Sequence, residues 1–359
     1  MPTPKALRRQ DPRWGSAATS RSDDRFALLR SRRRDPLCYA ADAGHRILRR
    51  LALGGEGGWD YLTVDPDARR LYISRSTHVV VVDLQTHRAI GEIPNTPGVH
   101  GIALAPDLNR GFTSNGKADT VAVFDLKTLK ILDTVKTGAN PDAILYDPPS
   151  GRVFTFNGRS QDSTVFDASS GSVLATIGLG GKPEFATSDE QGSVFVNIES
   201  TSEVVQLDSR RLTLSRRFSL KPCEEPTSMA IDRIHHRVFS GCHNRLMPVL
   251  DTESGKLTAT VPIGAGVDGN GYDPGTETAY SSNGEGTLTV VREVSPDKFS
   301  VVETVKTERG ARTMALDLKT QEIYLPTAKF VPSPSAAGSN PRREIVPDSF
   351  VVLVVGRSE

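Results

Sequence analysis

Short apolar runs, some continuous and some alternating with polar residues, recur along most of the chain. They are clearest at 71–74 (LYIS), 79–82 (VVVV) and 132–135 (LDTV), and they are rich in β-branched residues. Turn residues such as Asp65-Pro66-Asp67 separate them. The pattern therefore predicts many short β-strands joined by tight turns, and the 31 Gly and 23 Pro are consistent with that number of turns.

The strand pattern repeats with a period near 42 residues. Four short strands in each unit of this length are typical of a β-propeller, because one such unit cannot bury both faces of its own sheet. The repeats align on one position at the start of the first strand, which reads Asp60, His100, Asp142, Glu184, Thr227, Asp268 and Arg312. We therefore expect an all-β fold, a seven-bladed β-propeller with four antiparallel strands per blade.

The seventh repeat lacks its last strand. It offers strands near 313–317, 322–325 and 350–355, and then the chain ends. The run 45–55 resembles the missing fourth strand and its exit loop. We expect this N-terminal strand to complete the last blade, because ring closure removes an exposed sheet edge. The loop between the second and third strands of this blade carries a Pro- and Ser-rich insertion at 329–347.

Composition separates the N-terminal segment from the rest of the chain. Residues 1–35 hold ten Lys or Arg and four Asp, although the net charge of the 359 residues is only +1. Residues 1–43 are therefore expected to be a disordered basic leader, or sequence upstream of the true start, and 44–359 the propeller. The propeller is net acidic, which argues against nucleic acid as a partner. The sequence contains no run of 18 apolar residues, so it predicts no membrane-spanning helix. The leader lacks the apolar core of a secretory signal.

The ends of several second strands carry a recurring motif. It reads FTSN at 112–115, FTFN at 154–157 and YSSN at 280–283, and an exit loop GANP stands at 138–141. These motifs resemble the YVTN-repeat propellers, in particular the YncE-like family, over about residues 45–357. The resemblance implies the propeller fold, a monomer, and a periplasmic or secreted location. It also implies two known activities of relatives, lactone hydrolysis and single-stranded nucleic-acid binding.

In a propeller the aligned position lies at the mouth of the central channel. We expect a polar ring there, with four carboxylates, one histidine and one arginine: Asp60, Asp142, Glu184, Asp268, His100 and Arg312. Loops on the same face add Asn115, Asn157, His243 and Asn283 as ligand-binding candidates. The four carboxylates are candidate ligands for Ca²⁺ or Mg²⁺, because hard cations take several oxygen ligands. The alternative is a solvated channel mouth. The turns on the opposite face carry generic turn residues.

Three further residues are candidates with alternative interpretations. Trp59 stands beside Asp60 and is expected either to stack on a ligand or to pack between blades. Cys223 and Cys242 occupy neighbouring loops of one blade, where they form either a disulfide or two free thiols.

The run 264–269 matches the dinucleotide pattern GxGxxG, but it opens a strand and not a helix, so it lacks the phosphate-binding helix terminus.

Three functions are compatible with these residues. The first is a non-catalytic scaffold that binds a small polar ligand, a cation or a protein partner at the channel mouth. The second is a lactonase-like hydrolase in which His100 or Glu184 is the base and Arg312 stabilises the oxyanion. The third is single-stranded nucleic-acid binding, which the acidic mouth makes the least favoured.

Overall fold

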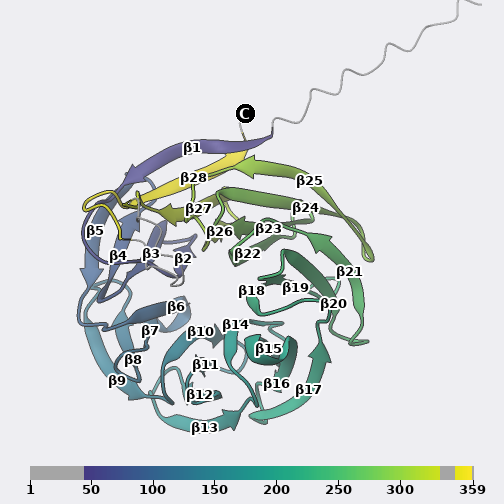
Figure 1. Ribbon diagram of the computed structural model, residues 1–359. Coiled ribbons are helices and arrows are strands. Elements are labelled where there is room, and N and C mark those ends of the chain that lie inside the picture. The colour runs from purple at the N-terminus through teal and green to yellow at the C-terminus, as the bar shows by residue number, and fades with distance from the viewer. Residues whose placement is uncertain (1–43, 332–343, 358–359) are drawn as a thin grey trace, which may run out of the picture. The chain divides into compact units, whose positions relative to one another are not determined.

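The computed structural model describes residues 44–331 and 344–357. Within these ranges the strands form seven four-stranded antiparallel sheets, arranged as blades around a central channel (Figure 1). The predicted seven-bladed β-propeller is therefore confirmed. The predicted leader and most of the insertion at 329–347 lie outside the described residues. No helix among the described residues is long and apolar enough to cross a membrane.

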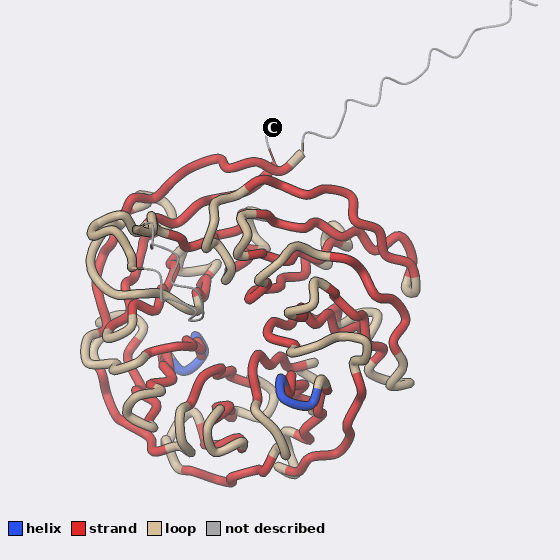
Figure 2. Tube along the Cα trace, viewed as in Figure 1, coloured by secondary structure: helices blue, strands red, loops and turns tan. Residues whose placement is uncertain are grey.

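Six of the blades use four consecutive strands, with the first strand innermost and the fourth outermost (Figures 1 and 2). Blades 1 to 3 contain β2 (Leu62–Asp65), β3 (Arg70–Arg75), β4 (His78–Asp83), β5 (Arg88–Ile93), β6 (Val99–Ala105), β7 (Arg110–Asn115), β8 (Thr120–Asp125), β9 (Ile131–Lys136), β10 (Pro141–Asp147), β11 (Arg152–Asn157), β12 (Asp162–Asp167) and β13 (Val173–Gly178). Blades 4 to 6 contain β14 (Pro183–Ser188), β15 (Ser193–Ile198), β16 (Glu203–Asp208), β17 (Thr213–Ser219), β18 (Pro226–Asp232), β19 (Arg237–Cys242), β20 (Leu246–Asp251), β21 (Leu257–Pro262), β22 (Val267–Asp273), β23 (Thr278–Asn283), β24 (Thr287–Ser295) and β25 (Lys298–Lys306).

Blade 7 joins the two ends of the described chain. Its sheet has the order β1 (His45–Ala52), β28 (Val351–Arg357), β27 (Glu322–Thr327) and β26 (Ala315–Asp317). β1 pairs with β28 from His45 opposite Arg357 to Ala52 opposite Val351, with a register shift between Ile47 and Arg49. The predicted closure by the N-terminal strand is confirmed, and β1 covers the edge of β28 that would otherwise be exposed.

Apolar residues of adjacent blades pack together and hold the ring. The cluster at the closure contains Leu51 of β1, Leu62 and Ile73 of blade 1, and Tyr324 and Phe350 of blade 7. The inner strands are buried on both faces, whereas the outer strands leave side chains such as Leu132 of β9 exposed. The outer strands of blades 1 to 6 are thus mostly solvent-accessible and bury one residue near their end, such as Val135 of β9.

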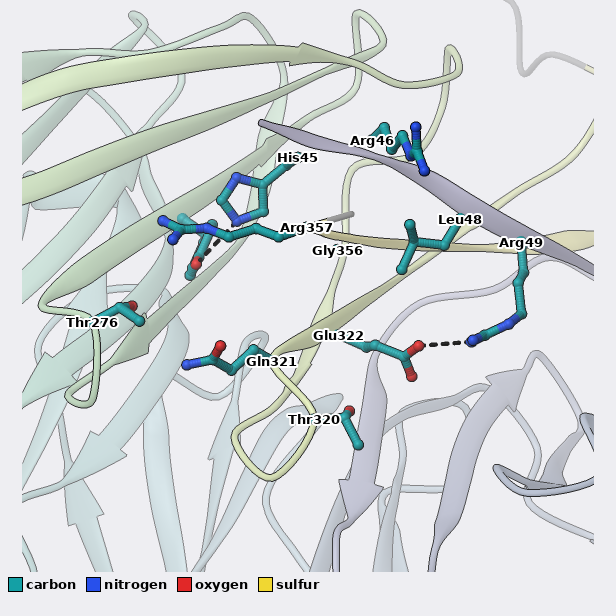
Figure 3. Close-up of a pocket in the computed structure, with 11 residues that line it drawn as sticks. His45, Arg46, Leu48, Arg49, Thr276, Thr320, Gln321, Glu322, Gly356 and Arg357 are labelled. Carbon is teal, nitrogen blue, oxygen red and sulfur yellow. Dashed lines mark hydrogen bonds and ion pairs between the residues drawn. The ribbon is translucent and has the colours of Figure 1, made fainter. Parts of the chain in front are cut away.

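Polar contacts of β1 border a cavity of about 790 Å³ between blades 6 and 7 (Figure 3). His45 Nδ1 lies 2.8 Å from Glu303 of β25, and its Nε2 lies 3.4 Å from the Tyr280 hydroxyl of β23. Arg49 donates to Glu322 of β27 at 2.6 Å. Side chains of β1 thus contact blade 6 as well as blade 7, in addition to the pairing with β28.

We predict that Leu51→Ala lowers the free energy of unfolding by about 3 kcal/mol, because it removes a buried side chain at the seam that closes the ring. Urea denaturation followed by circular dichroism measures this change. Arg50→Ala in the same strand is the control. It loses only an exposed ion pair with Glu308, and we expect it to cost less than about 1 kcal/mol. Equal effects of the two variants would contradict a stabilising role for this strand.

Candidate functional site at the channel mouth

The aligned position forms a polar ring at one end of the channel. His100, Asp142, Glu184 and Asp268 are each the second residue of a blade's innermost strand. Asp60 and Arg312 lie just before the innermost strands of blades 1 and 7. The innermost strands surround the channel (Figure 1), and each is the first strand of its blade. Equivalent positions of successive blades therefore face one another across the mouth.

His100 lies between two carboxylates of this ring. Its Nδ1 is 2.6 Å from Asp60 Oδ2 and 3.7 Å from Asp142 Oδ1. Burial opposes the charged imidazole, but the hydrogen bond to Asp60 and the negative charge of Asp142 outweigh it and raise the pKa of His100 to about 9. At neutral pH the His100 side chain is therefore an imidazolium, and its Nδ1–H donates to Asp60.

Arg312 makes the corresponding contacts on the other side of Asp60. One guanidinium nitrogen lies 3.0 Å from Asp268 Oδ2, and the other lies 3.9 Å from Asp60 Oδ1. The charge of Asp268 raises the pKa of Arg312. Four residues from blades 1, 2, 6 and 7 thus form a chain of alternating charge, Asp268, Arg312, Asp60 and His100.

Lys182 supplies a positive charge that the sequence analysis missed. Its ammonium donates to Glu184 at 2.5 Å and also contacts Glu199, so two carboxylates share one cation. Burial opposes the charge on Lys182, but its hydrogen bonds to Glu184 and Glu199 outweigh it and raise its pKa. Lys182 stands two residues before Glu184, directly ahead of β14. The sequence signal that could have identified Lys182 as a site residue is its position in an exit loop otherwise rich in Gly and Pro.

Three ring carboxylates have raised pKa values. Burial, with the negative charges of Asp60 and Asp268, raises the pKa of Asp142 to about 6. Burial also raises the pKa of Asp268 to about 6. Burial and the charge of Asp142 raise the pKa of Glu184 to about 8. These carboxylates lie close enough to disfavour one another's ionisation, so the mouth is a region of negative potential above these pKa values.

Tyr61 follows Asp60 and was also missed by the sequence analysis. Its ring lies 5.3 Å from that of Phe185 of β14, and it packs against the apolar cluster of blades 3 and 4. Tyr61 belongs to the segment that leads into blade 1, so this contact spans the channel. Burial and the charge of Asp142 raise its pKa well above the ordinary value. An aromatic side chain thus lies beside the carboxylate ring and remains neutral.

Arg75 holds the loop that positions Trp59 and Asp60. It is 2% exposed, and its guanidinium donates to the carbonyl oxygens of Gly54, Gly55, Glu56 and Gly57 at 2.8 to 3.2 Å. It also stacks over the ring of Phe350 at 3.8 Å. Burial lowers the pKa of Arg75 to about 10, so it remains charged at neutral pH. Gly57 has a φ of +88°, a conformation in which a side chain would be strained.

Trp59 packs between blades and also borders a small cavity beside the ring. Its centroid lies 5.4 Å from Phe350 and 6.1 Å from Phe330. The cavity has a volume of about 220 Å³, and Trp59, Arg312, Phe330 and Ile345 line it. Phe330 and Ile345 form an isolated bridge at the base of the insertion. An apolar recess therefore adjoins the charged ring at Arg312.

The three candidate asparagines have a different role from the one expected. Asn115, Asn157 and Asn283 end the second strands of their blades and are buried. Their amide groups bond to hydroxyl or carboxylate side chains of the same blade, as Asn157 does with Asp162 at 2.6 Å and Thr164 at 3.0 Å. These contacts fix the turn into the third strand and leave the side chains inside the blade. We therefore do not count them among the groups available to a ligand.

The remaining candidates lie in blade 5. His243 is exposed at the rim, and its Nδ1 lies 2.6 Å from Glu225 Oε2. Cys223 and Cys242 form a disulfide with a Cα–Cα distance of 5.7 Å. Thr227 takes the ring position in this blade but is buried, and its hydroxyl donates to the carbonyl of Val267 at 3.0 Å. Blade 5 thus contributes no charged group at the aligned position.

Asp60, His100 and Asp142 also have the spacing of a metal site, since one donor atom of each lies within 4.8 Å of the others. The hydrolase candidates His100, Glu184 and Arg312 lie in the same ring. Each of these three, however, has an oppositely charged partner of its own: Asp60, Lys182 and Asp268. The arrangement favours recognition of charge, because none of the three is held ready as an unpaired base or oxyanion donor.

Comparisons with known proteins bear on the fold alone. No family model and no curated protein matches the sequence. Among solved structures, hydrazine synthase from Kuenenia stuttgartiensis superposes with a TM-score of 0.65 and 16% identity over 75% of this chain and 92% of that chain. U3-55K and the WD40 repeats of RRP9 superpose with TM-scores of 0.70 and 0.71, each at 10% identity over 88% of this chain and 98% of theirs. At these identities the likeness supports the propeller architecture.

We predict that Arg75→Asn lowers the free energy of unfolding by about 3 kcal/mol, because buried carbonyls of the loop 54–57 lose their donor. Blades 2, 3 and 6 hold an asparagine at the equivalent strand end, so the replacement itself suits the fold. Denaturant titration measures the loss. Arg88→Asn, at an exposed position of β5, is the control, with an expected change within about 0.5 kcal/mol. A loss no larger than that of the control would refute the role of Arg75.

We predict that the melting temperature falls as the pH rises from about 5 to about 9. The pKa values of Asp142, Glu184 and His100 are raised in the folded state, to about 6, 8 and 9, so the folded protein binds more protons than the unfolded chain in this interval. Calorimetry across this pH range tests the sign. Glu184→Gln removes one titrating group and should flatten the profile between about pH 6 and pH 8; an unchanged slope would contradict this assignment.

Proposed function

We propose that this protein is a non-catalytic binding scaffold whose channel mouth holds a small, positively charged ligand. The observation that carries the proposal is the excess of acidic over basic side chains in one partly buried ring. The acidic members are Asp60, Asp142, Glu184, Glu199 and Asp268, and the basic members are His100, Lys182 and Arg312. A cation placed among these carboxylates would compensate charge that the protein itself leaves uncompensated.

Two kinds of cation share this chemistry. A hard dication such as Ca²⁺ or Mg²⁺ suits the carboxylate oxygens of Asp60 and Asp142. An organic ammonium suits the same oxygens and would also find an aromatic neighbour in Trp59, which lines the adjoining cavity. Positive charge is the property that both share, and the experiment below distinguishes them.

Binding accounts for the ring better than hydrolysis does. His100 carries its proton at neutral pH, since its pKa is raised to about 9, so it is not a general base there. The carboxylate of Glu184 is held by the Lys182 ammonium at 2.5 Å, so it is not free to accept a proton from a substrate. In a second form of this proposal, the same face binds a protein partner.

We further propose that the chain belongs with the YVTN-repeat, YncE-like propellers and acts in the periplasm or outside the cell. The motifs at 112–115, 154–157 and 280–283 support the family. The disulfide between Cys223 and Cys242 supports an oxidising compartment. The acidic mouth gives no support for nucleic acid as the ligand.

We expect Ca²⁺, Mg²⁺ or an organic diamine to raise the melting temperature, whereas sugar acids of similar size should have no effect, because only a ligand that binds the folded state stabilises it. The affinity of the stabilising cation, measured by calorimetry, should fall at least about tenfold in Asp142→Asn. It should also fall below about pH 6, where Asp142 and Asp268 take up protons. Comparison of the metal and diamine arms identifies the class of ligand.

Asp67→Asn is the matched control, because Asp67 is a highly exposed carboxylate in a turn on the opposite face. It should leave the affinity unchanged. Stabilisation by anions instead of cations would overturn the proposal. So would an equal loss of affinity in Asp142→Asn and Asp67→Asn.

A further inference from the structure

A second cluster of ionisable side chains lies between blades 5 and 6, on the face opposite the channel mouth. Asp232 ends β18, the innermost strand of blade 5, and His235 lies in the turn that follows. Glu293 of β24 and Tyr272 of β22 reach the cluster from blade 6. The two blades are neighbours in the ring (Figure 1). The sequence analysis treated the turns of this face as generic, so it missed the cluster.

Glu293 departs from the pattern of the repeat. In every blade from 1 to 6, one residue near the end of the third strand donates its backbone N–H to the turn between the first two strands. Those residues are Leu84, Leu126, Ala168, Ser209, Thr252 and Glu293. All six are buried, and blades 1 to 3 use apolar side chains there. The propeller therefore does not require a carboxylate at this position.

The carboxylate of Glu293 is only half satisfied. The residue is 3% exposed. Its Oε2 accepts a hydrogen bond of 2.9 Å from the Tyr272 hydroxyl, but Oε1 is buried and has no hydrogen-bond partner. A buried carboxylate oxygen without a partner is costly. Oε1 lies 3.9 Å from His235 Nδ1, so the unpartnered atom faces the rest of the cluster.

The other members have donor atoms directed to the same point. His235 Nδ1 lies 2.6 Å from Asp232 Oδ2, and the Tyr272 hydroxyl lies 3.1 Å from that oxygen. One donor atom each of Asp232, His235 and Glu293 lies within 4.8 Å of the others. Asp232 Oδ1 is occupied separately, because it accepts the backbone N–H groups of the turn. Oδ2 is thus the oxygen directed into the cluster.

Part of this cluster has an ordinary structural explanation, and Glu293 does not. Thr276 and Thr320, the turn residues equivalent to His235, donate to their own blade's aspartate at 2.8 Å. His235 repeats that contact with Asp232, so the Asp–His pair alone indicates only a turn. The turn does not explain why a buried carboxylate stands beside this pair, where blades 1 to 5 hold an uncharged residue. A ligand that satisfies Oε1 would.

We propose that Asp232, His235 and Glu293 bind a borderline transition-metal dication, with Zn²⁺ as the reference case, and that this ion ties blade 5 to blade 6. One imidazole nitrogen and two carboxylate oxygens form a donor set that Zn²⁺ accepts, whereas Ca²⁺ and Mg²⁺ prefer oxygen donors alone. Tyr272 holds the Glu293 carboxylate through Oε2, in the manner of the outer contacts that orient metal ligands. The site is separate from the channel mouth, so the two proposals stand or fall independently.

The test uses the full chain after removal of metal with EDTA. Zn²⁺ affinity is measured by competition with a chromophoric chelator, and Co²⁺ is added as a spectroscopic probe of ligation. We expect a site whose Zn²⁺ affinity falls at least about tenfold in Glu293→Gln and in His235→Ala. The visible Co²⁺ bands of the wild type should be lost in both variants.

Two controls keep the result interpretable. Glu293→Leu places in blade 6 the residue that blades 1 and 2 hold, so it should fold without metal at least as stably as the wild type and still lose the Zn²⁺ site. His100→Ala alters the cluster of Asp60, His100 and Asp142 at the channel mouth and should keep this Zn²⁺ site. The proposal is overturned if the wild type binds no Zn²⁺, if Glu293→Gln binds as the wild type does, or if only His100→Ala loses the ion.

Discussion

The antiparallel pairing of β1 with β28 is the contact on which the rest of the molecule depends. A propeller buries its blades only against one another, so an open seam would expose the apolar faces of blades 1 and 7. The same seam sets the channel mouth. Asp60 follows β1 in the chain and Arg312 precedes β26, and they lie 3.9 Å apart only because blade 7 closes onto blade 1. Stability and the polar ring therefore share one constraint.

The mouth shows how a symmetric scaffold can hold an asymmetric site. Each blade presents its innermost strand in the same way, so each can place one side chain in the ring. The chain uses these places unequally, with acids in four blades, a histidine and an arginine in two others, and a buried threonine in blade 5. Burial raises the pKa values of Asp142, Glu184 and Asp268, so a cation bound among them would favour their ionised forms.

Buried polar groups mark the places where this propeller departs from its own repeat. Arg75 replaces the asparagine that ends the second strand in three blades, and it holds the loop bearing Trp59 and Asp60. Glu293 stands on the opposite face where the other five blades hold an uncharged residue, and one of its oxygens has no hydrogen-bond partner. Desolvation makes such substitutions costly, so a fold does not acquire them for packing alone. They are therefore the positions where specific interactions should be sought.

The sequence by itself determined the strands, their grouping into seven blades, the closing strand and the members of the mouth ring. These follow from a period of about 42 residues, because a repeating unit places its equivalent residues at equivalent points in space. Tertiary structure alone decided which charges pair, that Lys182 and Tyr61 enter the site, and that Asn115 and its equivalents are buried. It also brought His235 to within 3.9 Å of Glu293. These points depend on the directions of side chains and on contacts between blades, and the pattern of residues along the chain specifies neither.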